Sequence, residues 1–187
     1  MSECTGTAGL LLAAGRGTRM GRPKALVTTD GVSWLDRSAR VLMDAGCAPV
    51  VVVLGAGAEE AGGLAPPGVA TVVAPDFAEG ISASLRAGLS ALAGSTASGA
   101  LVHLVDLPDV TAAVARRVLA SATGPTSLAR AVHDGVPGHP VLIGRAHWEP
   151  LLERLDGDTG ARSYLADAGA DPVECADLAT GRDVDSM

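Results

Sequence analysis

The alternation of short apolar runs with longer amphipathic segments is the feature that most constrains the fold. Runs rich in valine and leucine predict six strands, at residues 8–13, 49–54, 69–74, 100–105, 127–132 and 139–144. Amphipathic segments predict five helices, at residues 33–46, 81–94, 110–122, 146–155 and 159–169. Such alternation is typical of an α/β protein with three layers, in which helices cover both faces of a mostly parallel sheet. Because no long linker divides the 187 residues, we expect a single domain over residues 1–187.

Charge and cysteine content exclude several classes of protein. The formal net charge of −7 argues against a partner that is nucleic acid or an anionic membrane. The three cysteines (Cys4, Cys47, Cys175) lack the spacing of a disulfide framework or a zinc site. The longest apolar stretch, residues 48–58, is too short to span a bilayer, and the first residues do not read as a secretory signal. We therefore expect a cytoplasmic protein with reduced thiols.

A cationic, glycine-rich loop follows the first predicted strand, in "GLLLAAGRGTRMGRPKAL" (residues 9–26). Its glycines and cations are Gly15, Gly17, Gly21, Arg16, Arg19, Arg22 and Lys24. Glycines let the backbone approach a ligand closely, and the cations indicate that this ligand is negatively charged. Ligands of open α/β sheets bind beyond the carboxyl ends of strands, which is where this loop begins.

The spacing in this loop does not fit the two common phosphate-binding motifs. A P-loop needs a lysine directly after its last glycine, whereas Arg22 follows Gly21, and the third glycine of GxGxxG comes one residue late. A second cluster, Gly55 and Gly57, has Glu60 where a dinucleotide-binding motif needs glycine. The residues alone leave open a simple glycine-rich turn with solvated arginines.

The segment "LLLAAGRGTRMGRPKAL" resembles the signature of the MobA-like nucleotidyltransferases, which include the molybdenum-cofactor cytidylyl- and guanylyltransferases. Further segments resemble the same family in order along the chain: "GISASLRAGL" (80–89), "VDLPDV" (105–110), "GHPVLIGRAHWEPLLERLDGDTGAR" (138–162) and "DVDS" (183–186). The resemblance implies a Rossmann-like fold, an NTP with Mg²⁺, and transfer of an NMP group to a phosphorylated acceptor with release of pyrophosphate.

Two features favour the cytidylyl branch by resemblance, namely Ala13-Ala14-Gly15 and the segment 138–162. This branch implies transfer of CMP from CTP to the phosphate of a pterin-type acceptor, molybdopterin or molybdenum cofactor, with a molybdoenzyme or its chaperone as the recipient of the product. The alternatives are a guanylyltransferase or a sugar-phosphate nucleotidyltransferase of the same fold. From other classes, they are a nucleotide-binding module without turnover and a dinucleotide-binding domain that uses Gly55 and Gly57.

Nucleotidyl transfer requires charge neutralisation and alignment more than a covalent nucleophile, since it joins an anionic phosphate to a triphosphate. We expect backbone N–H groups of residues 15–17 to hold the triphosphate, with Arg19 and Lys24 as catalytic cations; Arg16 and Arg22 are weaker candidates. A phosphate monoester is largely dianionic at neutral pH, so no catalytic histidine is needed. The candidate nucleotide-binding residues are Leu12, Ala13, Ala14, Gly15, Arg16, Gly17, Lys24, Asp76, Ser82 and Ser84. For the two serines, helix capping is an equal alternative.

Asp106 is the predicted catalytic metal ligand. It follows the strand at 100–105 and precedes Pro108, which places its carboxylate at the carboxyl edge of the sheet. The resemblance implies that Asp106 and Asp185 bind Mg²⁺, with Asp183 as a lesser candidate, whereas Asp109 is expected to cap a helix.

The chain departs from the family pattern around Asp106, where Val105 and Leu107 replace the usual glycine and glutamine. Contacts that the glutamine would make to the acceptor are therefore in doubt. The resemblance places His139, Asp158 and Arg162 at the acceptor end of the site. The spacing of the four histidines does not indicate a metal site.

Overall fold

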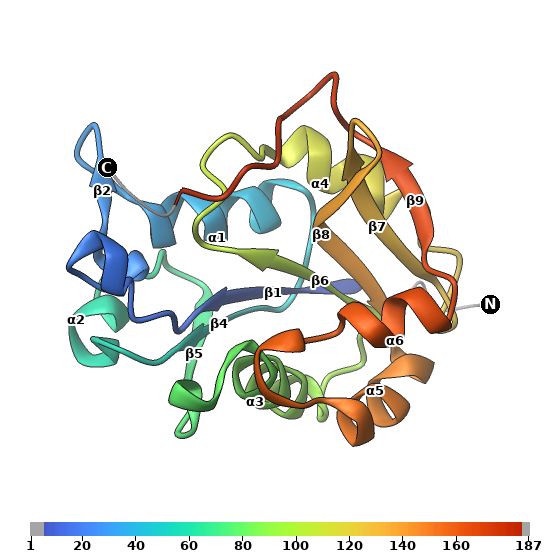
Figure 1. Ribbon diagram of the computed structural model, residues 1–187, viewed down its shortest axis with the longest axis horizontal. Helices are drawn as coiled ribbons and strands as arrows, with labels where there is room; N and C mark the ends of the chain where they lie inside the picture. Colours follow the sequence, from blue (N-terminus) through green and yellow to red (C-terminus); the bar gives the residue numbers. More distant parts are fainter. Residues whose placement is uncertain (1–5, 185–187) are drawn as a thin grey trace.

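A seven-stranded sheet forms the centre of the computed structural model, which describes residues 6–184 (Figure 1). The strand order is β5-β4-β1-β6-β8-β7-β9. The strands are β1 (Thr7–Ala13), β4 (Val50–Leu54), β5 (Val69–Val73), β6 (Gly99–Leu104), β7 (Leu128–His133), β8 (Val136–Gly144) and β9 (Asp171–Glu174). Strand β8 is antiparallel to both of its neighbours, β6 and β7, and every other pair in this sheet is parallel. The carboxyl ends of β1 and β6 therefore meet at one edge.

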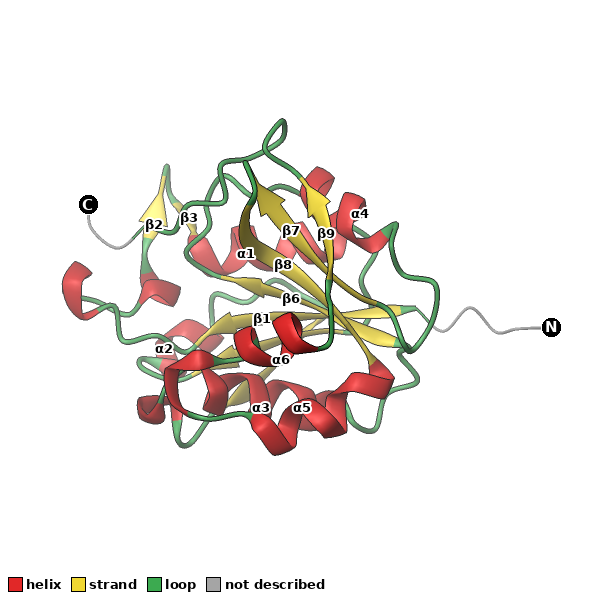
Figure 2. Ribbon diagram, turned by 45° about the vertical axis from the view of Figure 1, so that its right-hand side comes forward, coloured by secondary structure: helices red, strands yellow, loops and turns green. Residues whose placement is uncertain are grey.

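Helices cover both faces of the sheet (Figure 2). They are α1 (Trp34–Asp44), α2 (Ala58–Gly62), α3 (Ile81–Leu92), α4 (Ala112–Leu119), α5 (Trp148–Arg154) and α6 (Arg162–Asp167). In β1, Leu11 and Ala13 pack with α1, α2 and α4, whereas Leu10 and Leu12 pack with α3, α5 and α6. This period-two alternation explains how one short apolar run contributes to two cores. No helix within residues 6–184 is long and apolar enough to cross a membrane.

The structure confirms the three-layer, Rossmann-like α/β/α fold, and each predicted strand and helix is present with boundaries shifted by a few residues. Helix α1 begins as predicted, because the Ser33 hydroxyl accepts a hydrogen bond from the backbone N–H of Asp36 at 3.0 Å. Helix α5 carries Pro150 as its third residue, in the first turn where proline is tolerated.

The sequence analysis missed three short elements: strand β9, helix α2, and the two-stranded hairpin of β2 (Thr28–Thr29) and β3 (Val32–Ser33). Asp30 and Gly31 form its turn, with φ of 54° and 78°, as a two-residue hairpin requires. Strand β9 is four residues long and contains Pro172, so its sequence carries little strand signal.

Gly88 sets how closely helix α3 approaches the sheet. A Cβ atom at Gly88 would lie 2.4 Å from Leu10 Cδ1 and 2.9 Å from Val53 Cγ2, and both of these side chains are fully buried. We predict that Gly88→Ala lowers the free energy of unfolding by about 1–2 kcal/mol, because overpacking outweighs the better helix propensity of alanine. Urea denaturation measures this loss. Gly94→Ala is the control: its Cβ would meet no atom within 4 Å, and equal effects of the two variants would contradict the packing argument.

Candidate active site

In the loop after β1, contacts within the protein require glycine at position 17 but not at position 15. Gly17 has φ of 57°, and a Cβ there would lie 1.9 Å from the carbonyl oxygen of Arg22, so only glycine fits. Gly15 is exposed, lies outside the left-handed region, and a Cβ there would meet no atom within 4 Å. Packing therefore explains the glycine at position 17, and leaves the space in front of Gly15 open to a ligand.

The second glycine cluster, Gly55 and Gly57, packs closely against this loop and its surroundings. A Cβ at Gly55 would lie 2.6 Å from the Phe77 ring and 2.7 Å from the carbonyl oxygen of Ala14, and one at Gly57 would lie 3.1 Å from Leu26 Cδ1. Atoms of the chain itself thus fill the space beside both glycines. This packing gives no support to a dinucleotide site at Gly55 and Gly57.

Lys24 and Asp106 form an ion pair where the loop meets the end of β6. The Lys24 ammonium donates to Asp106 Oδ2 at 2.6 Å, and the two side chains are 16% and 15% exposed. They are 82 positions apart in the sequence and meet because β1 and β6 are adjacent and parallel. The structure therefore brings together the predicted catalytic lysine and the predicted metal ligand.

Asp106 also lines a cavity of about 700 Å³ between the sheet and helices α3 and α6. The three residues predicted for the acceptor lie in the same cavity, and Leu12 contributes to its wall. Apolar side chains from β6 and β8 form much of the rest. The polar residues of the lining are Asp106, Arg130, His139, Asp158, Thr159, Arg162 and Asp183.

An irregularity in β8 builds one wall of this cavity. Arg130 pairs with Val141 and Val132 with Pro137, so three residues of β8 (138–140) face the single residue Ala131. These three residues are the "GHP" of the family-like segment, and Gly138 and His139 line the cavity.

His139 and His103 are held in the neutral form by their surroundings. Desolvation, followed by the charges of His103, Arg130 and Arg162, lowers the pKa of His139 to about 3. Burial lowers the pKa of His103 in β6 to about 4, and neither of its ring nitrogens has a hydrogen-bond partner within residues 6–184. Both imidazoles are therefore uncharged at neutral pH and add no positive charge around the cavity.

Ser82 acts as a link between α3 and the loop at residues 156–160. Its hydroxyl donates to the carbonyl oxygen of Asp156 at 2.9 Å and accepts from the N–H of Gly160 at 3.2 Å. The N-cap of α3 is Gly80 and no side chain caps this helix, so the capping alternative for Ser82 and Ser84 is wrong. Both serines are buried.

Asp76 and Arg16 lie away from the cavity that Asp106 lines. Asp76 lines a separate cavity of about 370 Å³, which Ser82 also lines. The Arg16 guanidinium stacks over the Phe77 ring, 5.5 Å from its centre. Neither position decides whether these residues contact a nucleotide, so their assignments stay predictions. Arg19 is exposed in the short 3₁₀ helix Thr18–Met20.

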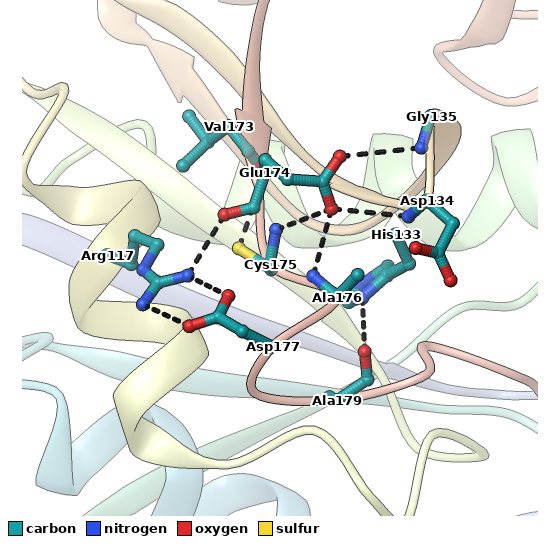
Figure 3. Close-up of polar contacts among 10 residues, drawn as sticks. All are labelled: Arg117, His133, Asp134, Gly135, Val173, Glu174, Cys175, Ala176, Asp177 and Ala179. Carbon is teal, nitrogen blue, oxygen red and sulfur yellow. Dashed lines mark hydrogen bonds and ion pairs between the residues drawn. The ribbon is translucent and has the colours of Figure 1, made fainter.

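The carboxyl-terminal segment (residues 175–184) is fastened to the body of the protein at its start (Figure 3). The Glu174 carboxylate accepts hydrogen bonds from backbone N–H groups, first Ala176 and then Asp134, Gly135 and Cys175, which lower its pKa. Arg117 of α4 forms a bidentate ion pair with the carboxylate of Asp177. These contacts fix where the segment leaves β9.

The same segment ends beside Asp106. The Asp109 carboxylate accepts two hydrogen bonds from Thr180, from its N–H and its hydroxyl, each at 2.6 Å. Burial opposes ionisation of Asp109, but these bonds, together with the backbone N–H groups of Gly181 and Asp109, outweigh it and lower its pKa. The N–H of Val184 then donates to the carbonyl oxygen of Asp106 at 3.0 Å. The prediction that Asp109 caps a helix is wrong, because Thr111 is the N-cap of α4.

The donor set suits a divalent cation that keeps water and phosphate ligands. Asp106 and Asp183 both line the main cavity, and no group of three or more metal-ligating side chains occurs in the part of the chain that the structure describes. Mg²⁺ is commonly held by only one or two carboxylates together with substrate phosphates, so these residues fit it. Asp185, the predicted second ligand, lies outside the described residues.

Comparison with known proteins identifies the family. Residues 9–173 match the profile of the MobA-like NTP transferase domain. The chain belongs to this family. It is therefore an enzyme of the nucleotidyltransferase class, as the sequence analysis predicted.

Three individual proteins illustrate the range of the relatives. The nicotine blue oxidoreductase of Paenarthrobacter nicotinovorans is 34% identical, and the match covers 96% of this chain and 92% of that protein. The molybdenum cofactor guanylyltransferase of Rhodobacter capsulatus is 33% identical, over 79% of this chain and 68% of that protein. A crystal structure of Rv0371c from Mycobacterium tuberculosis, in complex with manganese, is 29% identical with a TM-score of 0.73, and the match covers 91% of this chain and 88% of that one.

The sequence analysis missed two parts of this region. Arg130 lines the cavity from the middle of β7, in a run that reads as an ordinary strand, so only its charge among apolar neighbours could have marked it. The fastening of the segment 175–184 depends on contacts between residues distant in sequence, such as Asp109 with Thr180, which have no local signal.

We predict that Gly15→Ala weakens NTP binding at least 10-fold while it changes the free energy of unfolding by less than about 0.5 kcal/mol. The added methyl group meets no protein atom, but it stands where a phosphate would approach the backbone. Calorimetry with NTP and Mg²⁺ gives the affinity, urea denaturation gives the stability, and Gly94→Ala is the control. Wild-type affinity of Gly15→Ala would remove this residue from the phosphate site.

Proposed function

We propose that this enzyme transfers CMP from CTP to the phosphate of a molybdopterin-type acceptor and releases pyrophosphate. The observation that carries the proposal is the Lys24–Asp106 ion pair. It lies between the glycine-rich loop, which suits a triphosphate, and the cavity of about 700 Å³, which suits an acceptor. We further propose that the enzyme acts in the cytoplasm, as one domain over residues 1–187, and passes its product to a molybdoenzyme or its chaperone.

Nucleotidyl transfer requires the protein to hold the triphosphate of the NTP and the phosphate of the acceptor close together and in line. Backbone N–H groups of residues 15–17 bind the triphosphate, and Arg19 adds positive charge at its exposed side. Lys24 exchanges its partner Asp106 for an oxygen of the α-phosphate, and stabilises the charge that gathers there in the transition state. The acceptor phosphate approaches from the cavity side. No side chain needs to act as a nucleophile or as a base.

Asp106 and Asp185, or Asp183 in its place, would hold Mg²⁺ in this proposal. The cation supplies charge neutralisation between the carboxylates and the phosphates. The manganese in the related Rv0371c structure supports a divalent cation for the family. The Lys24–Asp106 pair fits this role, because the carboxylate that pairs with the lysine in the protein alone becomes available once the lysine turns to phosphate.

The choice of CTP rests on Ala13-Ala14-Gly15 and on the "GHPVLIG" segment. The guanylyltransferase of Rhodobacter capsulatus, at 33% identity, supports GTP equally well as the alternative donor. A sugar phosphate as acceptor and a module that binds a nucleotide without turnover are weaker alternatives. Neither alternative explains why a lysine is paired with a carboxylate that lines the cavity.

A redox role is the second candidate, because the match to the nicotine blue oxidoreductase covers 96% of this chain. In that case the cavity, with its many apolar side chains, would take a flat organic compound. A nicotinamide cofactor would have to use the loop at residues 14–24, since the glycines at positions 55 and 57 are packed against the chain itself.

Lys24→Ala is expected to lower kcat by about 10²–10³-fold and to change the KM for NTP much less, since the lysine acts mainly on the transition state. Pyrophosphate release under saturating NTP measures kcat. Arg40→Ala, which removes an exposed cation of α1, is the control and should behave as the wild type. An unchanged kcat with a raised KM would make Lys24 a binding residue only.

Donor choice is tested by pyrophosphate release from each of the four NTPs in the presence of molybdopterin or molybdenum cofactor and Mg²⁺. We expect kcat/KM for CTP to exceed that for GTP or ATP by at least 10-fold, on the scale of a pocket that reads the base by hydrogen bonds. Equal or faster turnover of GTP would replace CTP by GTP in the proposal. Oxidation of NADH or NADPH without turnover of any NTP would favour the redox candidate.

A further inference from the structure

We propose that Arg130 and Arg162 form a second anion-binding site in the cavity of about 700 Å³ that Asp106 lines, apart from the Lys24–Asp106 pair. We call this cavity the acceptor cavity. This site would bind a negatively charged group of the acceptor other than the phosphate that is attacked. The inference rests on the proposed function in one respect, namely that the ligand of this cavity is the acceptor.

The guanidinium of Arg130 is only weakly engaged by the protein. It lies in β7, half-buried in the cavity wall, where its Nη2 makes a long hydrogen bond of 3.4 Å to the carbonyl oxygen of Gly138. Its Nε is buried and has no hydrogen-bond partner within residues 6–184. Over the same residues, Arg130 forms no ion pair with a carboxylate. A guanidinium left with unmet donors at a cavity wall is suited to a bound anion.

Arg162 adds a second positive charge to the same cavity. Both arginines line this cavity, and burial, followed by the positive charge of Arg162, lowers the pKa of Arg130. Arg162 likewise has no ion pair within the described residues. Arg130 is half-buried and Arg162 is exposed, so the repulsion bears mainly on Arg130, and an anion bound between the two cations would relieve it.

Asp158 does not neutralise this pair. It lines the same cavity, but its carboxylate lies over the start of α3: a Cβ atom built on Gly80 would be only 2.3 Å from Asp158 Oδ1. Negative charge is favoured at that helix end. The arginines therefore remain available to a ligand.

The sheet register separates this site from the reacting phosphates. Arg130 pairs with Val141, and Val141 pairs with Val102, which lies four residues before Asp106. Two strand spacings, about 10 Å, therefore separate Arg130 from Val102 across the sheet, and Asp106 lies farther on, in the turn beyond the end of β6 at Leu104. The backbone of Arg130 thus lies two strands away from that of Asp106 and at a different level along the sheet, so the anion that Arg130 would bind is placed apart from the phosphate at Asp106.

The wall between the two positions indicates what joins them. It consists of Val102, Leu104, Val141 and the neutral His139, so the body of the ligand that lies along it is uncharged. The substrate class that fits is an elongated acceptor with its phosphate at the Asp106 end and a second anionic group at the arginine end.

The test uses inorganic phosphate as the probe, titrated calorimetrically into the full chain at low ionic strength with the nucleotide site saturated by CTP and Mg²⁺. We expect Arg130→Gln and Arg162→Gln each to weaken binding of the phosphate ion at least 10-fold, and Arg130→Lys to retain part of it. Arg116→Gln, at an exposed arginine of α4, is the matched control. With molybdopterin as acceptor, the Gln variants should raise the KM for the acceptor and leave the KM for CTP unchanged.

Phosphate binding and an acceptor KM equal to the wild type in both folded Gln variants would overturn the inference. If Arg130→Gln does not fold, Arg162→Gln and Arg130→Lys give the same decision. Failure of the proposed function looks different: CTP then neither binds nor releases pyrophosphate in the wild-type enzyme. In that event, loss of phosphate binding in the arginine variants, measured without nucleotide, would still establish the anion site.

Discussion

The parallel pairing of β1 with β6 is the constraint on which the site depends. The loop with Lys24 leaves β1, and Asp106 follows β6, so the two side chains meet only because these strands are neighbours with their carboxyl ends at one edge. The pairing continues past the strand ends, where the N–H of Val105 donates to the carbonyl oxygen of Leu12 at 3.2 Å. A shift of this register would turn alternate side chains to the opposite core and separate the ion pair.

The antiparallel strand β8 forms part of the cavity wall. By running back between β6 and β7, it brings Gly138 and His139 to the cavity beside the carboxyl end of β6. Strand β9 then extends the sheet, and the segment 175–184 returns from it to Asp106. The contacts of Glu174, Arg117 and Asp109 along this path define where Asp183 lies, although none of these three residues is close to it in sequence.

The sequence predicted the fold well because each core strand carries its own local signal, a short apolar run bounded by turn residues. It also indicated the loop at residues 9–26 and Asp106, whose positions follow from the strand ends. It could not predict the Lys24–Asp106 contact, the link from Ser82 to Gly160, or the role of Asp109, because these depend on which distant segments become neighbours. Local reasoning even misassigned Asp109, since an aspartate before a helix usually caps it.

A protein with a net negative charge can bind an anionic ligand only where individual cationic side chains lie close to that ligand. The formal net charge is −7, and charges on the surface are screened over about 8 Å at physiological ionic strength. Lys24 pairs with Asp106 and Arg130 lines the cavity, where partial burial limits screening, and in the proposed function each would contact an anionic group of a substrate directly. The carboxylates of Asp106 and Asp183 stand among them, so the site as a whole is not a basic surface. In the proposed function, a preference for a small, multiply charged ligand over a nucleic acid would follow from the placement of individual charges and not from their sum.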